Sequence, residues 1–390
     1  MTLLKTDSST ILVVDDSKAQ ASFIRNVLEG DYETVLAASG LEGLEKYKEI
    51  NPDLIILDIE MPHMNGYEVC RRLKAMTEDT FVPVIFLTSN TDLDSLTMGL
   101  HIGGEDFLTK PFVPEELKAR VQAALRTKKQ YSKLETAHAT VEKERDMIAN
   151  IQKGLLCDEP PDIEGMRFFT DYQPSSKAGG DYYDFIPIDQ DHLGVLISDV
   201  SGHGTPAAVI MAMMRVLLSS FASQTHSPKA TLQKLNKILR QNLETGFFIT
   251  TFYGVIHLPS KVMTYASAGH PPPVFINYDT ESVLELWTKK GIPLMILPNN
   301  DMEEGKIQLE PNCKLTLYTD GLTEAKNEVG EMFGAQRLVH TLQQLGKTRN
   351  ANELGIRVKE EIQEFTGKQG FSDDYTLVIL EVIPPETVQE

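Results

Sequence analysis

Acidic and hydroxyl side chains follow a series of short apolar segments in the first third of the chain. Asp15 and Asp16 come directly after one such run, Asp58 lies near the end of another, and Thr88 and Lys110 follow two later runs. Because the carboxyl ends of parallel strands meet at one edge of a sheet, we expect these side chains to lie close together. Neighbouring carboxylates repel one another unless a divalent cation neutralises them, and oxygen ligands favour Mg²⁺. Lys110 and Thr88 would then offer a positive charge and a hydroxyl to phosphoryl oxygens.

A second set of carboxylates is spread over the C-terminal half of the chain, beside glycines and β-rich runs. The set consists of Asp181, Asp199, Asp320 and Asp373. Glycine lets backbone carbonyls approach a ligand, and carboxylates at strand ends can hold two divalent ions about 4 Å apart. Mn²⁺ or Mg²⁺ suits an all-oxygen site, and no cysteine or histidine ligands for zinc are arranged beside these aspartates. The set therefore predicts attack of metal-bound water on a phosphate monoester.

The first 126 residues alternate short apolar strands with amphipathic helices. We expect helices such as 41–50 and 115–125 between strands at 11–14, 32–37, 53–59, 83–89 and 106–112. Strict alternation of this kind is typical of an α/β doubly wound sheet, here with five parallel strands.

A long polar helix is expected from about 114 to 153. Its heptad seam contains Tyr131, Leu134, His138, Val141, Arg145, Ile148, Gln152 and Leu155. His138, Arg145 and Gln152 interrupt the apolar repeat. Two interpretations stay open: a dimeric coiled coil, which we favour and which would make the protein a homodimer, or one helix packed on a neighbouring domain.

From residue 166 onward, strands rich in Tyr, Phe, Val and Ile dominate. Helices are expected between them at 206–222, 228–244, 334–345 and 351–366. This texture predicts an α+β domain built as a layered β-sandwich with helices outside. The predicted organisation is a first domain at 1–126, a helical linker at 127–157 and a second domain at 158–390.

The first domain resembles the response-regulator receiver family over residues 9–126, and the segment DIEMPHMNG (58–66) is the most specific match. The resemblance implies that a sensor histidine kinase phosphorylates Asp58. It also implies that Mg²⁺ is held by Asp16, Asp58 and the Glu60 carbonyl, with Asp15 acting largely through water.

The same resemblance makes Thr88 and Phe107 the pair that senses the phosphoryl group. Phe107 stands where the family often has tyrosine. A contact made by a tyrosine hydroxyl is therefore lost, although an aromatic rotamer switch remains possible.

The second domain resembles the stage II sporulation E branch of the PPM protein phosphatases over residues 150–383. The matching segments are KAGGDYYDF, ISDVSGHGTPAA, SAGHPPP, LYTDGLTEA and DDYTLVIL, in the family order. The resemblance assigns metal binding to Asp181, Asp199, the Val200 carbonyl, Asp320 and Asp373.

Other polar residues in these motifs have less certain roles. Asp184 and Asp374 are either outer-shell carboxylates of the metal site or surface and capping carboxylates. Lys177 is a candidate for binding the substrate phosphate, since the motifs contain no arginine. His203 and His270 lie in loops rich in glycine or proline, where we expect structural roles.

Composition limits the classes of function. The net charge is −19, and no segment is basic, so nucleic-acid binding is not expected. The sequence shows no apolar run long enough to cross a membrane and no signal peptide. Three scattered cysteines agree with reduced thiols in a cytoplasmic protein.

The sequence thus predicts a two-component response regulator whose phosphorylation at Asp58 controls an attached metal-dependent serine/threonine phosphatase. For this branch the resemblance implies that the substrate is a phosphorylated anti-sigma factor antagonist. The alternative is a catalytically inactive adaptor that binds a partner of a sigma-factor pathway. Loss of the metal aspartates would indicate the adaptor, and all four are present.

Overall fold

The computed structural model describes residues 9–76, 81–89, 93–156, 159–202, 204–243, 246–289 and 291–384. The chain divides into two compact units, Met1–Val141 and Glu142–Glu390. The boundary lies inside the longest helix, α5 (Pro114–Lys153).

The first unit contains a five-stranded sheet in the order β2-β1-β3-β4-β5, with every neighbouring pair parallel. Its strands are β1 (Thr10–Val14), β2 (Glu33–Ala37), β3 (Leu54–Asp58), β4 (Val84–Thr88) and β5 (Asp106–Thr109). The helices before α5 are α1 (Lys18–Leu28), α2 (Gly40–Ile50), α3 (Gly66–Met76) and α4 (Leu93–His101). The predicted doubly wound fold is confirmed.

Apolar side chains on both faces of this sheet explain its continuous hydrophobic strands. Alternate residues of β1 enter two different cores, Leu12 with Leu57 on one face and Ile11 with Ile56 on the other. Helices cover each face, as a parallel sheet requires. Only the strand ends are left to carry polar chemistry.

Helix α5 has the bounds that the sequence predicts. Between 129 and 147 all its side chains except Glu142 are exposed, among them Leu134 and Val141. Gln152 near its end is buried, at 4% exposure, although the heptad pattern assigned it to the same seam. Leu134 and Val141 leave apolar positions of the seam exposed, whereas the Tyr131 ring lies 4.9 Å from that of Phe81, measured between centroids. Pairing of the seam in a dimer stays a prediction.

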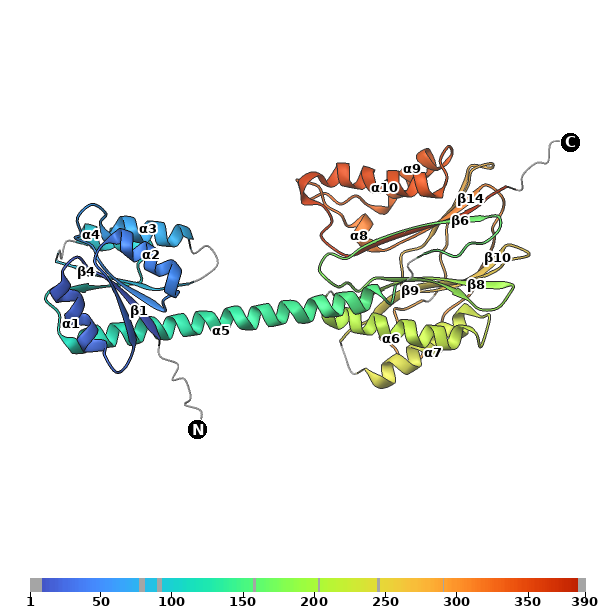
Figure 1. Ribbon diagram of the computed structural model, residues 1–390. Coiled ribbons are helices and arrows are strands. Elements are labelled where there is room, and N and C mark those ends of the chain that lie inside the picture. The colour runs from blue at the N-terminus through green and yellow to red at the C-terminus, as the bar shows by residue number, and fades with distance from the viewer. Residues whose placement is uncertain are drawn as a thin grey trace. The chain divides into compact units, whose positions relative to one another are not determined.

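The second unit stacks two antiparallel sheets between two layers of helices (Figure 1). One sheet has the order β13-β10-β9-β8-β7 and the other β12-β11-β14-β15-β6. A core containing Phe252 and Leu315 lies between the sheets, and separate cores lie under α6 with α7 and under α9 with α10. The predicted layered sandwich is confirmed.

The strands of this unit are β6 (Met166–Gln173), β7 (Tyr182–Pro187), β8 (His192–Val200), β9 (Ile249–His257), β10 (Val262–Ala268), β11 (Val274–Asn277), β12 (Ser282–Glu285), β13 (Gly305–Gln308), β14 (Cys313–Tyr318) and β15 (Tyr375–Val382). The helices are α6 (Thr205–Ala222), α7 (Pro228–Asn242), α8 (Asp320–Thr323), α9 (Ala335–Gly346) and α10 (Ala351–Thr366), followed by the 3₁₀ turn Gly367–Gln369. The sequence did not predict β11, β12, β13 or α8. Each has four residues, which is too short for a clear periodic pattern.

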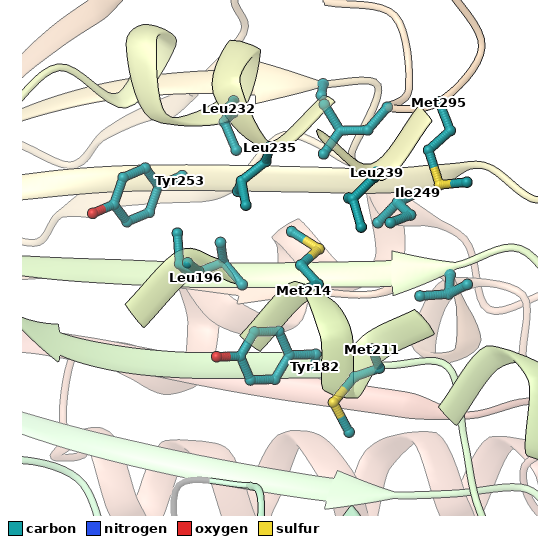
Figure 2. Packing of buried hydrophobic residues seen from close by; sticks show 14 of the residues in the cluster. Tyr182, Leu196, Met211, Met214, Leu232, Leu235, Leu239, Ile249, Tyr253 and Met295 are labelled. Atoms are coloured by element: carbon teal, nitrogen blue, oxygen red, sulfur yellow. The ribbon is translucent and has the colours of Figure 1, made fainter. Parts of the chain in front are cut away.

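Helix α6 packs its methionines into the core against the sheet. Met211 and Met214 lie among Tyr182, Leu235 and Tyr253 (Figure 2). Among the described helices, α6 alone is long and apolar enough to cross a membrane by length and composition. Its packing in this core accounts for that composition, since a core helix of a globular domain passes the same test.

Truncation of Met214 tests this packing. Met214→Ala should lower the free energy of unfolding of the second unit by about 2–5 kcal/mol, because a buried cavity replaces the thioether. Val216→Ala, on the exposed face of the same helix, should change it by less than about 0.5 kcal/mol. The fluorescence of Trp287, the single tryptophan, reports this unit alone during urea unfolding of the full chain. Equal effects of the two substitutions would contradict the packing.

Candidate functional sites

The polar residues of the first unit meet at the carboxyl edge of its sheet. Lys110 Nζ lies 2.8 Å from Asp58 Oδ2 and 3.5 Å from Asp15 Oδ2. Carboxylate oxygens of Asp15, Asp16 and Asp58 lie within 4.8 Å of one another. Thr88 is buried at the end of the neighbouring strand β4. The structure therefore brings together the five residues that the sequence singled out.

A cation fits among these carboxylates. Burial is the main reason that the pKa of Asp15 is raised, and its Oδ2 accepts no hydrogen bond although it is buried. The nearby Lys110 carries one positive charge against three carboxylates. A divalent cation would supply the missing charge, and its oxygen ligands are already in place.

Backbone geometry positions Asp58 and the neighbouring loop. The amide of Glu60 donates to Asp58 Oδ1 at 3.3 Å. A Cβ on Gly66 would lie 2.3 Å from the Asp58 carbonyl oxygen, so only glycine permits this close approach. Phe107 lies on β5, where it pairs with Phe86 of the neighbouring strand β4. Thr88 is the last residue of that same strand β4.

In the second unit, Asp181 is held between two threonines. The hydroxyls of Thr319 and Thr376 donate to Asp181 Oδ2 at 2.7 and 2.8 Å. The carboxyl group is buried where the start of β7 meets the end of β14 and the start of β15. Burial is the main reason that its pKa is raised well above the usual value, and repulsion from Asp199 is the second. Thr319 lies in the segment LYTDGLTEA and Thr376 in DDYTLVIL, but neither was predicted to belong to the site.

Asp199, Asp320 and Asp373 complete an acidic cluster with Asp181. Burial raises the pKa of Asp199 to about 7, with further contributions from the charges of Asp320 and Asp373. The pKa of Asp320 is raised by burial and then by Glu324 and Asp373. Within the described ranges, no lysine or arginine forms an ion pair with any of the four carboxylates. Asp181 is buried, Asp199 and Asp320 are half-buried, and Asp373 is exposed. Neighbouring carboxylates that repel one another and lack a cation of the protein fit divalent metal ions.

Two glycines allow the backbone to close around this cluster. A Cβ on Gly180 would lie 2.6 Å from the Val200 carbonyl oxygen, which the sequence assigned to a metal. A Cβ on Gly321 would lie 1.9 Å from the carbonyl oxygen of Asp374. A larger residue at the first position would push the segment carrying Asp181 away from Val200, and one at the second would push the segment carrying Asp320 away from Asp374.

Asp374 orders the glycine loop that precedes Asp181. It accepts hydrogen bonds from the amide and hydroxyl of Ser175, at 2.7 and 2.8 Å, and from the Gly180 amide at 2.6 Å. These hydrogen bonds favour the first of the two interpretations for Asp374, in which it lies behind the acidic cluster and supports the loop that precedes Asp181.

Asp184 lies elsewhere. Asp184 accepts a hydrogen bond from the Tyr182 hydroxyl. Burial raises its pKa, and this hydrogen bond together with the charge of Arg215 on α6 offsets part of the increase. Side chains alternate along β7, so Asp184 shares with Tyr182 the face that α6 covers. The structure therefore does not place Asp184 around the metal carboxylates.

Lys177 is also committed elsewhere. Its Nζ forms ion pairs with Glu142 at 2.8 Å and Asp146 at 2.7 Å, both on α5. The structure gives it a contact with the linker helix in place of the predicted contact with a substrate phosphate.

Gln152 makes a second link between α5 and the site. Its side-chain amide donates to the Gly179 carbonyl at 2.7 Å and accepts from the Gly179 amide at 3.1 Å. Gly179 lies two residues before Asp181. The end of α5 is thus bonded to the backbone of the loop that carries a metal carboxylate.

A hollow of about 280 Å³ opens beside Asp199 and Asp320. Trp287, His270 and two prolines line it further. His270 is buried, with Nδ1 2.9 Å from the Thr250 hydroxyl, and burial lowers its pKa to about 3. A neutral, buried imidazole agrees with the structural role predicted for His270. His203 lies outside the described residues.

Comparison with known proteins assigns both units. Residues 189–383 match the family Stage II sporulation protein E (SpoIIE), and residues 11–122 match the Response regulator receiver domain. The SpoIIE match covers half of the chain, so the chain belongs to this family and carries a receiver domain in addition. It is a response regulator joined to a phosphatase domain.

Curated relatives and solved structures agree with this assignment. The chain is 29% identical over 242 residues to the phosphoserine phosphatase RsbU of Bacillus subtilis, covering 62% of this chain and 70% of RsbU. It is 44% identical over 117 residues to the DNA-binding response regulator MtrA of Mycobacterium tuberculosis, covering 30% of this chain and 50% of MtrA. The chain thus spans about half the length of MtrA.

Two solved structures share the fold of the second unit. The SiaA-PP2C domain of Pseudomonas aeruginosa has a TM-score of 0.55 at 21% identity, over 63% of this chain and 98% of that one. The RsbU and RsbW domains of Rv1364c from Mycobacterium tuberculosis give 0.51 at 24% identity, over 58% and 62%. At these identities the likeness shows the fold alone.

The raised pKa values of Asp181 and Asp199 predict how stability depends on pH without metal. The folded state holds protons that the unfolded state has released above about pH 4. In a chelator, the free energy of unfolding of the second unit should therefore fall as pH rises from about 4 to 7, by at most about 1.4 kcal/mol per pH unit for each group. Added Mn²⁺ should restore more stability at pH 7 than at pH 5, because metal binds the ionised carboxylates.

Trp287 fluorescence in urea, measured across this pH range, checks the prediction. Asp199→Asn should flatten the pH dependence, whereas Asp162→Asn, at an exposed position, should not. A metal-free protein with the same pH dependence in both variants would contradict the proposed repulsion.

Proposed function

We propose that the chain is a response regulator in which phosphorylation of Asp58 controls a metal-dependent protein serine/threonine phosphatase. The observation that carries the proposal is the acidic cluster of Asp181, Asp199, Asp320 and Asp373, which has no cation of the protein among its described ion pairs. Asp181 is buried, Asp199 and Asp320 are half-buried, and Asp373 is exposed. An acidic cluster with this environment has a large free-energy penalty unless metal ions bind.

The proposed ligands of two Mn²⁺ or Mg²⁺ ions are Asp181, Asp199, the Val200 carbonyl, Asp320 and Asp373. Bound ions of this kind lower the pKa of coordinated water and so supply a nucleophile for phosphate esters. Thr319 and Thr376 hold the Asp181 carboxylate in position, and Asp374 holds the glycine loop. In the receiver, the proposed Mg²⁺ ligands are Asp15, Asp16, Asp58 and the Glu60 carbonyl, with Lys110 and Thr88 toward the phosphoryl oxygens.

The proposed substrate is a phosphoserine or phosphothreonine of an anti-sigma factor antagonist. The similarity to RsbU, a phosphoserine phosphatase by name, supports this class. The hollow beside Asp199 and Asp320 is open to solvent at Trp287, which is 66% exposed, so a protein segment can reach it. The proposed phosphodonor for Asp58 is a sensor histidine kinase, and the proposed location is the cytoplasm.

We further propose domain limits of 1–126, 127–157 and 158–390, and a homodimer formed along α5. The exposed seam residues Leu134 and Val141 support pairing of two α5 helices. Gln152 and Lys177 would carry the signal, because both connect α5 to the loop before Asp181. A shift or rotation of α5 would break these contacts and displace that loop.

If the chain were a catalytically inactive adaptor, the acidic cluster would not have to bind metal ions. An inactive adaptor has no need of four neighbouring carboxylates, from buried Asp181 to exposed Asp373, whose repulsion destabilises the unit without metal. The first experiment below distinguishes the two.

Hydrolysis of an aryl phosphate should require Mn²⁺ or Mg²⁺ and fall more than about a hundredfold in Asp199→Asn, because one substitution disturbs both ions and the nucleophilic water. Asp162→Asn serves as the exposed control. Full activity in a strong chelator would overturn the metal assignment, and no metal-dependent activity in the native chain would favour the adaptor.

Coupling is tested by measuring the phosphatase rate with and without a small phosphodonor for Asp58. The rate should respond in the native chain and not in Asp58→Asn. Gln152→Ala should lower the rate by about tenfold, because the loop before Asp181 loses two buried hydrogen bonds. Lys153→Ala, at the neighbouring exposed position of α5, should leave it unchanged.

A double substitution examines the seam itself. Val141→Asp with Ile148→Asp should remove the response to phosphorylation while both metal sites keep their ligands, because charges oppose helix pairing. Sedimentation of the two forms should show weaker self-association of the variant. An undiminished response would mean that α5 is a passive tether.

A further inference from the structure

A second group of metal-ligand side chains lies in the phosphatase unit, apart from the acidic cluster. It contains Asp189 and His192 at the β7–β8 hairpin and His226 in the loop between α6 and α7. Ligand atoms of the three residues lie within 4.8 Å of one another. No motif of the sequence analysis includes any of them.

The two imidazoles face opposite oxygens of one carboxylate. His192 Nδ1 lies 2.8 Å from Asp189 Oδ1, and His226 Nε2 lies 2.7 Å from Asp189 Oδ2. The rings are stacked, with centroids 3.8 Å apart and planes inclined by 14°. Two nitrogens and a carboxylate thus converge from two separate loops on one small volume.

Both loops are ordered by their own hydrogen bonds. In the hairpin, the Ile188 amide donates to the His192 carbonyl at 3.0 Å, and the Asp191 amide donates to Asp189 Oδ1 at 2.9 Å. On the other side, Ser227 caps α7 by accepting from the Ala230 amide at 3.1 Å. His226 directly precedes this cap, so its position is set by the start of the helix.

A third histidine stands next to the pair. His257 lies opposite His192 in the β8–β9 register, and their ring centroids are 4.9 Å apart. Its Nδ1 accepts from the Ser260 amide at 3.4 Å and contacts the Ser260 hydroxyl at 2.6 Å, so Nε2 is the nitrogen left toward other partners.

The chemistry of this set differs from that of the catalytic cluster. Imidazole nitrogens with a carboxylate are typical ligands of Zn²⁺, whereas Mg²⁺ prefers oxygen alone. A single shared metal ion would replace the contacts of both imidazoles with Asp189.

We propose that Asp189, His192 and His226 form a Zn²⁺ site separate from the phosphatase centre. Zinc bound there joins the β7–β8 hairpin to the α6–α7 loop. Helix α6 begins five residues after Val200 and, with 18 residues, spans about 27 Å. The ion would therefore anchor the end of α6 that lies away from the catalytic loop, and its role is to stabilise this helix pair against the sheet.

The test is calorimetric titration of Zn²⁺ into the metal-free full chain, in the Asp199→Asn background, which weakens the catalytic metal site. One more Zn²⁺ should bind to this protein than to the same protein carrying His192→Gln and His226→Gln. Zinc should also slow hydrogen exchange of residues 223–228 at least tenfold, and the double histidine substitution should abolish this effect. Neither readout depends on phosphatase activity, so the proposal can fail while the proposed function stands.

His340→Gln, at an exposed position on α9, is the matched control and should leave both readouts unchanged. Asp189→Asn provides a second variant in case the double substitution perturbs folding, and it should weaken zinc binding at least tenfold. Equal zinc stoichiometry in the double variant, or saturation only at millimolar Zn²⁺, would overturn the proposal and leave the three residues as a surface hydrogen-bond network.

Discussion

Repulsion between buried carboxylates is the constraint on which both units depend. In the receiver, Lys110 neutralises part of the charge of Asp15 and Asp58. In the phosphatase unit, hydroxyls of Thr319 and Thr376 bond to Asp181, but a hydroxyl carries no charge. Negative charge therefore remains unbalanced in each site, and more so in the second unit, where none of the four carboxylates has an ion-pair partner among the described residues. The pKa of Asp199 is raised to about 7, which means that this carboxylate binds a proton more tightly than an ordinary aspartate does.

The backbone around the acidic cluster is arranged to accept that charge density. Gly180 and Gly321 allow carbonyl oxygens of Val200 and Asp374 to pass at distances that a side chain would forbid. Asp374 bonds to the loop before Asp181, and Gln152 of α5 bonds to the same loop one residue earlier. The position of this loop therefore depends both on Asp374 and on the end of α5, and a proposed metal bound at Asp181 would depend on it in turn.

This arrangement gives a physical meaning to the order of the elements along the chain. The helix that leaves the receiver sheet is the same helix whose last turns contact the phosphatase loop. The proposed signal through α5 would need only to change the geometry of two hydrogen bonds of Gln152 and two ion pairs of Lys177. A few kcal/mol of differential interaction is enough to shift a two-state population, and contacts of this kind supply that amount.

By itself the sequence determined the fold class of both units and the bounds of α5, because these follow from strong periodicity. It also singled out aspartates at strand ends beside glycines, whose binding of metal ions stays a proposal. Short elements such as β11 and β13 were not predictable, since four residues carry little periodic signal. Only the tertiary structure decided between Asp184 and Asp374, because the face of β7 on which a side chain lies depends on which layer packs there. The tertiary structure also decided that Gln152 bonds to Gly179 and that Lys177 pairs with α5. It brought His226 next to Asp189, which lies 37 residues earlier in the chain. Contacts between distant segments depend on how the layers stack, which local patterns of residues do not encode.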